Sequence, residues 1–210
     1  MSEISSKAVI DHLVTSDVRR LNHIRRYSSY PIIRQENVAE HLFWVTYSSY
    51  LIALDIKNYT AGITVDMDAL MEKAMLHDLE ESQTGDVVRT FKYHSPETRT
   101  LMNQTAIGLI SKFLTDTLPK QVAEHVISRL KVSKDESLEG QIVALADLLA
   151  VLTYGREELL LGNSKMRGIL IKSLDYLREF RRNIKHQCLI PYVDEIIRCV
   201  LTTVSSSKET

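Results

Sequence analysis

Residues 141–155 constrain the fold of this 210-residue chain more than any other segment. Asp147 is the only charged residue in this segment, and apolar residues flank it on both sides. A helix that is apolar almost all round lies in a protein core, where an unpaired carboxylate costs several kcal/mol. Asp147 must therefore be neutral, paired with a base or bound to a metal ion. We interpret it as a metal ligand; the alternative is a buried ion pair with an Arg from the N-terminal segment.

Helical spacing of apolar residues recurs along the rest of the chain, and no segment has the convincing alternation of a strand. With 44% apolar and 25% charged residues, a chain of this length is expected to form one soluble domain. We predict an all-α fold in which residues 1–204 form a single domain and residues 205–210 form a frayed tail. The predicted helices are two short ones within residues 4–26, then residues 38–57, a helix capped by Asp66 that contains His77 and Asp78, and residues 96–118, 120–131, 137–161, 165–185 and 191–204.

Composition excludes several functional classes. The net charge of −1 argues against a general nucleic-acid binder, because such proteins usually carry a basic excess. Cys188 and Cys199 are the only cysteines and have no C-x-x-C spacing, so a disulfide framework is not expected and a reducing compartment fits. No apolar run reaches the ~18 residues of a membrane span, and the N-terminus lacks the apolar core of a signal peptide. We expect a cytoplasmic protein with no nucleic-acid or membrane partner.

His77 and Asp78 form a second chemical signal. Neighbouring residues of a helix project about 100° apart, so both side chains can reach one ion, and Glu81 lies one turn further on. By itself the pair fits a solvated helix end equally well. His41, in the first turns of an earlier helix, is a candidate partner, and a simple packing role is its alternative.

Together these residues would supply two imidazoles and two carboxylates. Such a mixed nitrogen and oxygen set suits Co, Mn, Fe or Zn better than Mg. We therefore expect one divalent metal ion. The candidate ligands are His41, His77, Asp78 and Asp147.

The whole pattern resembles the HD-domain metal-dependent phosphohydrolases, which combine a first His, a His-Asp pair and a later Asp on an apolar helix. It resembles most closely the bacterial 5′-deoxynucleotidase branch of these enzymes. The short motifs that match this family cover most of the chain, and as a set at this spacing they are specific. They are Arg26, residues 34–41, His77-Asp78 with Glu81, Thr84-Gly85-Asp86, Lys92-Tyr93, Ala146-Asp147-Leu148, Glu157-Glu158 and Gly162-Asn163.

The resemblance implies a compact HD-type helical fold with the metal site between helices, and it assigns roles by position. The four candidate ligands match the family's metal ligands, Glu81 matches its catalytic acid–base carboxylate, and Asp86 matches a second carboxylate near the scissile ester. Arg26 matches a phosphate-binding Arg, and Lys92 is a further expected substrate contact. After that Arg the family typically has Trp, which helps select 2′-deoxyribose. This chain has Tyr27 there, so we expect a smaller deoxy preference.

The expected activity is hydrolysis of (deoxy)nucleoside 5′-monophosphates to nucleoside and phosphate, by a homodimer. One alternative is a deoxynucleoside triphosphate hydrolase, for example one acting on dATP, with the same metal site. The other is a non-catalytic nucleotide-binding module. Its natural signature would be the loss of a metal ligand or of Glu81, and the sequence retains all of these residues.

Overall fold

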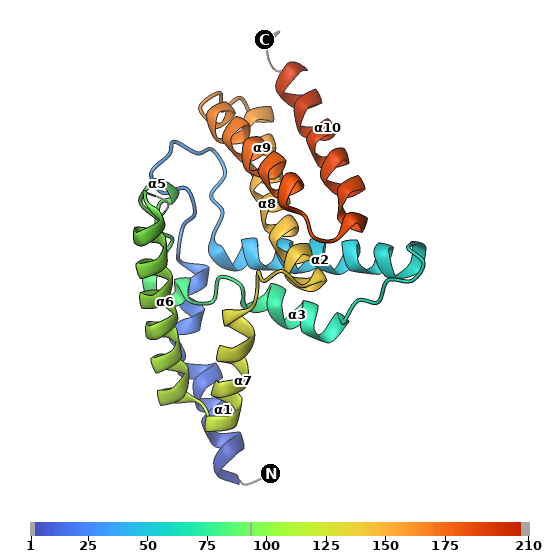
Figure 1. The fold of residues 1–210 in the computed structure, drawn as a ribbon. Coiled ribbons are helices and arrows are strands. Elements are labelled where there is room, and N and C mark those ends of the chain that lie inside the picture. Colours follow the sequence, from blue (N-terminus) through green and yellow to red (C-terminus); the bar gives the residue numbers. More distant parts are fainter. Residues whose placement is uncertain (1–2, 93, 207–210) are drawn as a thin grey trace.

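The computed structural model describes residues 3–92 and 94–206, and this part of the chain is helical without β-strands (Figure 1). The predicted all-α class is therefore confirmed. The elements are α1 (Glu3–Thr15), the 3₁₀ helix η1 (Asp17–Asn22), α2 (Val38–Tyr59), α3 (Met67–Leu76), α4 (Glu81–Thr84), α5 (Arg89–Lys92), α6 (Pro96–Thr117), α7 (Lys120–Lys131), α8 (Leu138–Leu160), α9 (Met166–Asn183), the 3₁₀ helix η2 (Gln187–Leu189) and α10 (Ile190–Ser206).

Side-chain caps explain where several helices begin. Asn37 and Glu40 form a reciprocal capping box at the start of α2, so two otherwise unsatisfied backbone groups gain partners. Asp66 accepts a hydrogen bond from the backbone N–H of Ala69 and caps α3, as the sequence predicted. Ser137 caps α8 through the N–H of Gly140.

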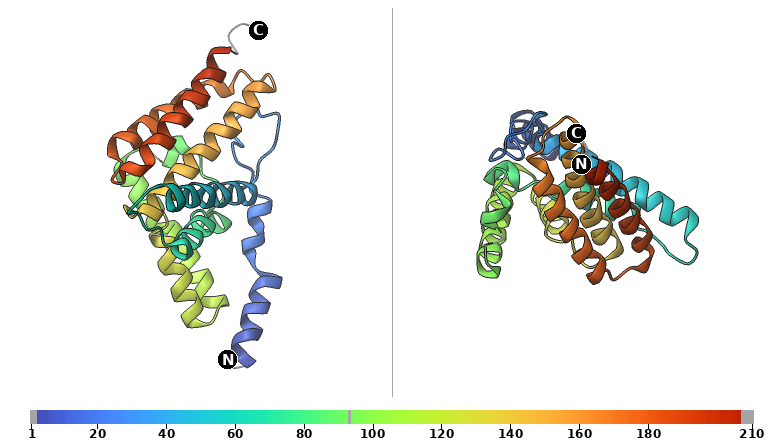
Figure 2. Two further views of the ribbon diagram at one scale, coloured as in Figure 1. Left: turned by 90° about the vertical axis from the view of Figure 1, so that its right-hand side faces the viewer. Right: turned by 90° about the horizontal axis from the view of Figure 1, so that it is seen from above.

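Helix α2 crosses the middle of the molecule, with α8, α9 and α10 on one side and α6 and α7 on the other (Figure 1). Helix α1 and the end of α10 lie at opposite ends of the molecule (Figures 1 and 2). One core cluster joins α2, α3, α8, α9 and α10, and a second joins η1, α6 and α7 to the start of α2 and the end of α3. Two chain segments therefore pass from one cluster into the other.

Helix α8 is the central core helix that the sequence predicted. Ile142, Leu145 and Leu152 on it are completely buried. By length and composition α8 could also cross a membrane, but 61% of its apolar window is buried inside the fold. Burial of this extent is what the core helix of a globular protein has.

The structure corrects the prediction around the His-Asp pair. Helix α3 ends at Leu76, so His77 and Asp78 lie in the turns after the helix rather than inside it. The ring Nδ1 of His77 lies 2.7 Å from the carbonyl oxygen of Ala74. A continued helix would offer that carbonyl to the backbone N–H of Asp78, so the side chain competes with the helix.

Two short helices, α4 and α5, were not predicted, because the sequence around them reads as a polar break and a connecting loop. Helix α10 continues to Ser206, two residues beyond the predicted domain end. Residues 207–210 of the predicted tail lie outside the described residues.

Candidate metal centre and substrate pocket

Four side chains from three elements converge where the two core clusters meet. His41 comes from α2, Asp147 from α8, and His77 and Asp78 from the turns after α3. One potential ligand atom of each residue lies within 4.8 Å of those of the other three. The structure thus brings together all four residues that the sequence predicted as metal ligands.

The atoms of this cluster are arranged with the ring nitrogens facing carboxylate oxygens. His41 Nε2 lies 3.1 Å from Asp147 Oδ1 and 3.6 Å from Asp78 Oδ2, and His77 Nε2 lies 3.2 Å from the same Asp78 oxygen. Since a carbonyl can only accept, the contact with Ala74 puts the His77 proton on Nδ1 and leaves the Nε2 lone pair free. Both Nε2 atoms are buried and make no hydrogen bond to any described residue.

The protonation states also suit a cation. Burial and the charge of Arg26 lower the pKa of His41 to about 4, so the imidazole is neutral at pH 7. Burial acts to raise the pKa of Asp78, but the adjacent His77 and the ammonium of Lys134 outweigh it and hold the pKa well below its usual value. The pKa of Asp147 is lowered in the same way, mainly by Lys134 and His41 against the effect of burial. Neutral imidazoles and ionised carboxylates are the forms that bind metal ions, so the four residues fit a divalent metal.

Asp147 is also ion-paired, though not with the predicted partner. Its Oδ2 accepts a hydrogen bond of 2.7 Å from Nζ of Lys134, in the loop before α8, and no arginine among the described residues forms an ion pair with it. The sequence-based alternative of an ion pair with an N-terminal Arg is therefore replaced by a pair with Lys134.

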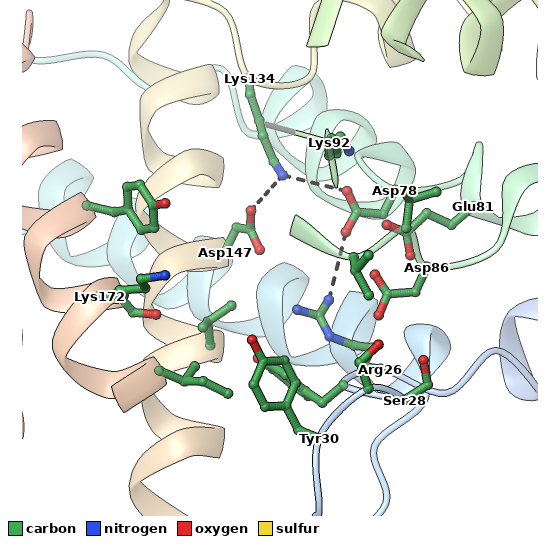
Figure 3. A pocket seen from close by; sticks show the side chains of 18 residues that line it. Arg26, Ser28, Tyr30, Asp78, Glu81, Asp86, Lys92, Lys134, Asp147 and Lys172 are labelled. Atoms are coloured by element: carbon green, nitrogen blue, oxygen red, sulfur yellow. Dashed lines mark hydrogen bonds and ion pairs between the residues drawn. The ribbon is translucent and has the colours of Figure 1, made fainter. Parts of the chain in front are cut away.

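A pocket of about 550 Å³ opens in front of the cluster. Its size falls within the ~300–1,000 Å³ typical of small-molecule sites. The two buried histidines are not among the lining residues, whereas the two candidate ligand carboxylates and the other predicted site residues line the wall (Figure 3). The lining residues used below are Arg26, Tyr27, Asp78, Glu81, Asp86, Lys92, Lys134 and Asp147.

Glu81 and Asp86 have raised pKa values. Burial, with the like charges of Asp78 and Asp86, raises the pKa of Glu81 to about 9. Burial also raises the pKa of Asp86, against the opposing charge of Arg26. A cleft that holds carboxyl groups with displaced pKa values is a common feature of hydrolytic sites.

Arg26 is held at the pocket from two sides. Its Nε lies 3.3 Å from Glu36 Oε2, and its Nη1 lies 4.0 Å from Asp78 Oδ2. Burial raises the pKa of Glu36 to about 7, although the neighbouring positive charge of Arg26 acts in the opposite direction. Sequence reasoning missed Glu36, although it lies in the matching word 34–41.

The loop after Arg26 is fixed by the far end of α8. The carboxylate of Glu158, which is completely buried, accepts from the backbone N–H groups of Ile33 (2.8 Å) and Arg34 (2.6 Å). The side-chain amide of Asn163 donates to Glu158 Oε2 and to the carbonyl of Pro31. The family words at 157–158 and 162–163 therefore include the residues that hold this loop.

Lys134 lines the pocket, but no feature of the sequence predicted a role for it. It lies in the polar run 133–137, which reads as a connection between helices. Only the fold brings this loop close to the carboxylates of Asp78 and Asp147.

A model of the family described as 5′-deoxynucleotidase YfbR-like matches residues 14–195. The 5′-deoxynucleotidase VP0926 of Vibrio parahaemolyticus is 29% identical over 163 residues, which cover 78% of this chain and 82% of that protein. The 5′-deoxynucleotidase PM0747 of Pasteurella multocida is 30% identical over 151 residues, covering 71% and 75%.

The solved structures agree with this family. An HD-domain phosphohydrolase of Listeria innocua (lin2634) superposes with a TM-score of 0.78 at 26% identity, covering 93% of this chain and 92% of that one. The cyanophage S-2L HD phosphohydrolase DatZ, solved with dA and one catalytic Zn²⁺ ion, gives 0.63 at 17% identity over 91% and 96%. At that identity the second likeness concerns the fold alone.

Proposed function

The chain belongs to the YfbR-like 5′-deoxynucleotidase family and is a metal-dependent phosphohydrolase, and we propose that it hydrolyses deoxynucleoside 5′-monophosphates to nucleoside and phosphate. The observation that carries this proposal is the cluster of His41, His77, Asp78 and Asp147 at the base of a nucleotide-sized pocket. No nucleic-acid partner is proposed, since the net charge is −1.

His41 and His77 would bind one divalent metal ion through Nε2, and Asp78 and Asp147 would bind it through carboxylate oxygens. When bound, the ion would offset phosphoryl charge and lower the pKa of a water molecule. We propose Mn or Co, with Fe or Zn as further candidates and Mg as the weakest, because two imidazoles are softer ligands than an all-oxygen set.

The chain's own residues would position the ester and move its protons. Arg26, held by Glu36, would bind an equatorial oxygen of the phosphate, and Lys92, which also lines the pocket, would contact the substrate as well. Glu81 would orient or deprotonate the attacking water, a role for its carboxylate form. Besides burial, the negative charges of Asp78 and Asp86 raise the pKa of Glu81. A bound cation would offset these charges and so favour the carboxylate form of Glu81. Asp86, whose raised pKa favours the protonated form, would donate to the departing 5′ oxygen.

A phosphate-release screen tests the proposal. Metal-supplemented protein is given ribo- and deoxynucleoside mono-, di- and triphosphates, and the products are separated by chromatography. We expect nucleoside and inorganic phosphate from deoxynucleoside 5′-monophosphates. Release of triphosphate from a deoxynucleoside triphosphate would favour the second enzyme class. Nucleotide binding without turnover in any metal would favour a binding module.

We also propose a cytoplasmic homodimer. Helix α2 carries a row of exposed aromatic and aliphatic side chains at helical spacing, a pattern that a second copy could cover. Their exposed fractions are 61% for Phe43, 48% for Trp44, 47% for Tyr47, 40% for Tyr50 and 46% for Leu51. Light scattering at micromolar concentration tests the state, with Tyr47→Lys expected to shift a dimer to monomer. A wild-type monomer would contradict the proposal.

A further inference from the structure

Each candidate ligand carboxylate directs its two oxygens in different directions. Asp147 Oδ1 faces His41 at 3.1 Å, whereas Asp147 Oδ2 faces Lys134 at 2.7 Å. Asp78 Oδ2 faces His77 at 3.2 Å, whereas Asp78 Oδ1 faces Lys134 at 3.6 Å. Asp147 Oδ1 and Asp78 Oδ2 thus face the histidines, whereas the other oxygen of each carboxylate faces the ammonium group of Lys134.

Lys134 is held in this place by the residues that follow it. Nζ of Lys73, a buried lysine of α3, donates to Asp135 Oδ1 (2.7 Å) and to the hydroxyl of Ser137 (2.8 Å). The backbone N–H of Ser137 also donates to Asp135 Oδ1, at 3.1 Å. A Cβ atom at Gly140 would come within 2.6 Å of the backbone oxygen of Asp135, so only glycine allows this close approach. The loop that carries Lys134 is therefore fixed by partly buried polar contacts.

The ammonium group still faces the pocket. The side chain of Lys134 is 32% exposed and forms part of the pocket wall. An ammonium has three N–H donors, and the two carboxylates use at most two of them. Figure 3 shows Lys134 reaching Asp78 from one side and Arg26 reaching it from the other. A phosphate approaching the cluster between these residues meets a cation on each side.

We propose that Lys134 is a phosphate-binding residue that also balances the charge of Asp78 and Asp147 when no metal ion is bound. This inference rests on the proposed function, because it assumes a metal ion at the cluster and a phosphate ester in the pocket. It assigns two opposite effects to one side chain. The ammonium repels a divalent cation and attracts a phosphate.

Removing the charge of Lys134 should therefore strengthen metal binding and weaken phosphate binding, and the experiment measures both. Lys134→Met removes the charge and keeps an unbranched side chain that is one atom shorter. Calorimetric titration of the chelated protein with Mn²⁺ is expected to give roughly tenfold tighter binding in this variant. Titration of the Mn²⁺-saturated variant with inorganic phosphate is expected to give binding that is roughly tenfold to a hundredfold weaker. KM for a deoxynucleoside monophosphate should rise in parallel with the phosphate dissociation constant.

Two further variants serve as controls. Lys134→Arg keeps the charge and should restore both affinities to within about threefold of the wild-type values. Lys131→Met removes the charge of an exposed lysine at the end of α7 and should change neither. If Lys134→Met does not fold, Lys134→Gln, which retains a donor for Asp147, carries the same expectation.

The outcomes separate this inference from the proposed function. A parallel loss of Mn²⁺ and phosphate affinity would make Lys134 a structural residue and overturn the inference. Unchanged phosphate affinity would overturn it as well. Wild-type protein that binds no divalent metal would instead overturn the proposed function.

Discussion

Tyr27 adopts a conformation that its surroundings enforce. Its φ of 56° lies in the left-handed region, which is unfavourable for a bulky residue. Its ring stacks on that of Tyr154 with centroids 4.7 Å apart and planes inclined by 4°. One face of the ring is thereby covered, and the residue contributes to the pocket wall. The sequence predicted a sugar contact here but gave no sign of the partner, because Tyr154 is distant in the chain.

Changing the size of this ring should change sugar selection. A flat ring against C2′ leaves a 2′-hydroxyl without room or a partner, so ribonucleotides bind the transition state less well. Tyr27→Trp should widen the ratio of kcat/KM for deoxy- over ribonucleotides, and Tyr27→Ala should reduce it towards one while deoxynucleotide hydrolysis stays measurable. Tyr59→Ala, at a tyrosine that is 83% exposed, is the control. The same ratio in all variants would mean that Tyr27 does not touch the sugar.

Glu81 should separate binding from catalysis. Glu81→Ala is expected to leave Mn²⁺ and nucleotide affinity within about threefold of wild type and to lower kcat by roughly 10²–10⁴. The variant Glu81→Gln tests the raised pKa in metal-free protein. A folded-state pKa of about 9, above the unfolded value of 4.5, gives stability that is complete below pH 4.5 and is lost as the pH rises towards 9.

Thermal unfolding therefore provides a second measurement at this residue. At pH 9, metal-free Glu81→Gln should melt at least about 3 °C above the wild type, and the difference should shrink towards pH 5. A normal kcat in Glu81→Ala would require another residue to activate the water. A melting difference that does not depend on pH would contradict the raised pKa.

At the scale of elements, α8 does more than supply Asp147. Its last turns hold the loop 27–36 through Tyr154, whose hydroxyl donates to the carbonyl of Arg34 at 2.5 Å, and through Glu158. The helices themselves were predictable, because caps such as Asn37 and apolar spacing are local signals. The end of α3 was not, because it depends on how the His77 ring competes for a backbone carbonyl.

Adjacent glutamates on α8 allow a matched test of this anchor. Glu158→Ala leaves the backbone N–H groups of Ile33 and Arg34 without their acceptor, so it should lower the free energy of unfolding by roughly 2–4 kcal/mol. It should also raise KM for nucleotides, because the loop positions Arg26. Glu157→Ala removes only a half-exposed pair with Arg34 and should cost less than about 1 kcal/mol in urea unfolding. Equal losses in both variants would contradict the anchoring role.

At the scale of the whole molecule, the site joins the two core clusters. Val38 and Val45, on either side of His41, belong to different clusters, and so do Ala74 and Leu79 around the His-Asp pair. The types of the site residues were predictable from the sequence because their chemistry is unusual for a core. Their convergence was not, since it depends on how α2, α3 and α8 pack.

Metal binding should therefore stabilise the whole fold. At about 100 times the dissociation constant, Mn²⁺ should add ~2.7 kcal/mol, which is roughly 5–10 °C in melting temperature, and chelation should reverse this gain. Asp147→Asn should abolish most of the gain by weakening Mn²⁺ binding. If Asp147 serves only as the partner of Lys134, the variant will lose stability while calorimetry finds wild-type Mn²⁺ affinity.

Loop 27–36 is held by Glu158 and Asn163, which lie far along the chain from it. This separation means that the loop is synthesised well before the residues that hold it. Arg26 leaves the ribosome long before Asp147, Glu158 and Asn163 do. At ~5–20 residues per second, the 137 positions from Arg26 to Asn163 take roughly 7–30 s to translate. Between the synthesis of Asp78 and that of Asp147, the nascent chain has both histidines and Asp78 but neither the last carboxylate nor the contacts that hold loop 27–36. The proposed site is thus incomplete until Asp147 and the residues that hold loop 27–36 have been synthesised, so hydrolysis is not expected from a nascent chain that ends before Asn163.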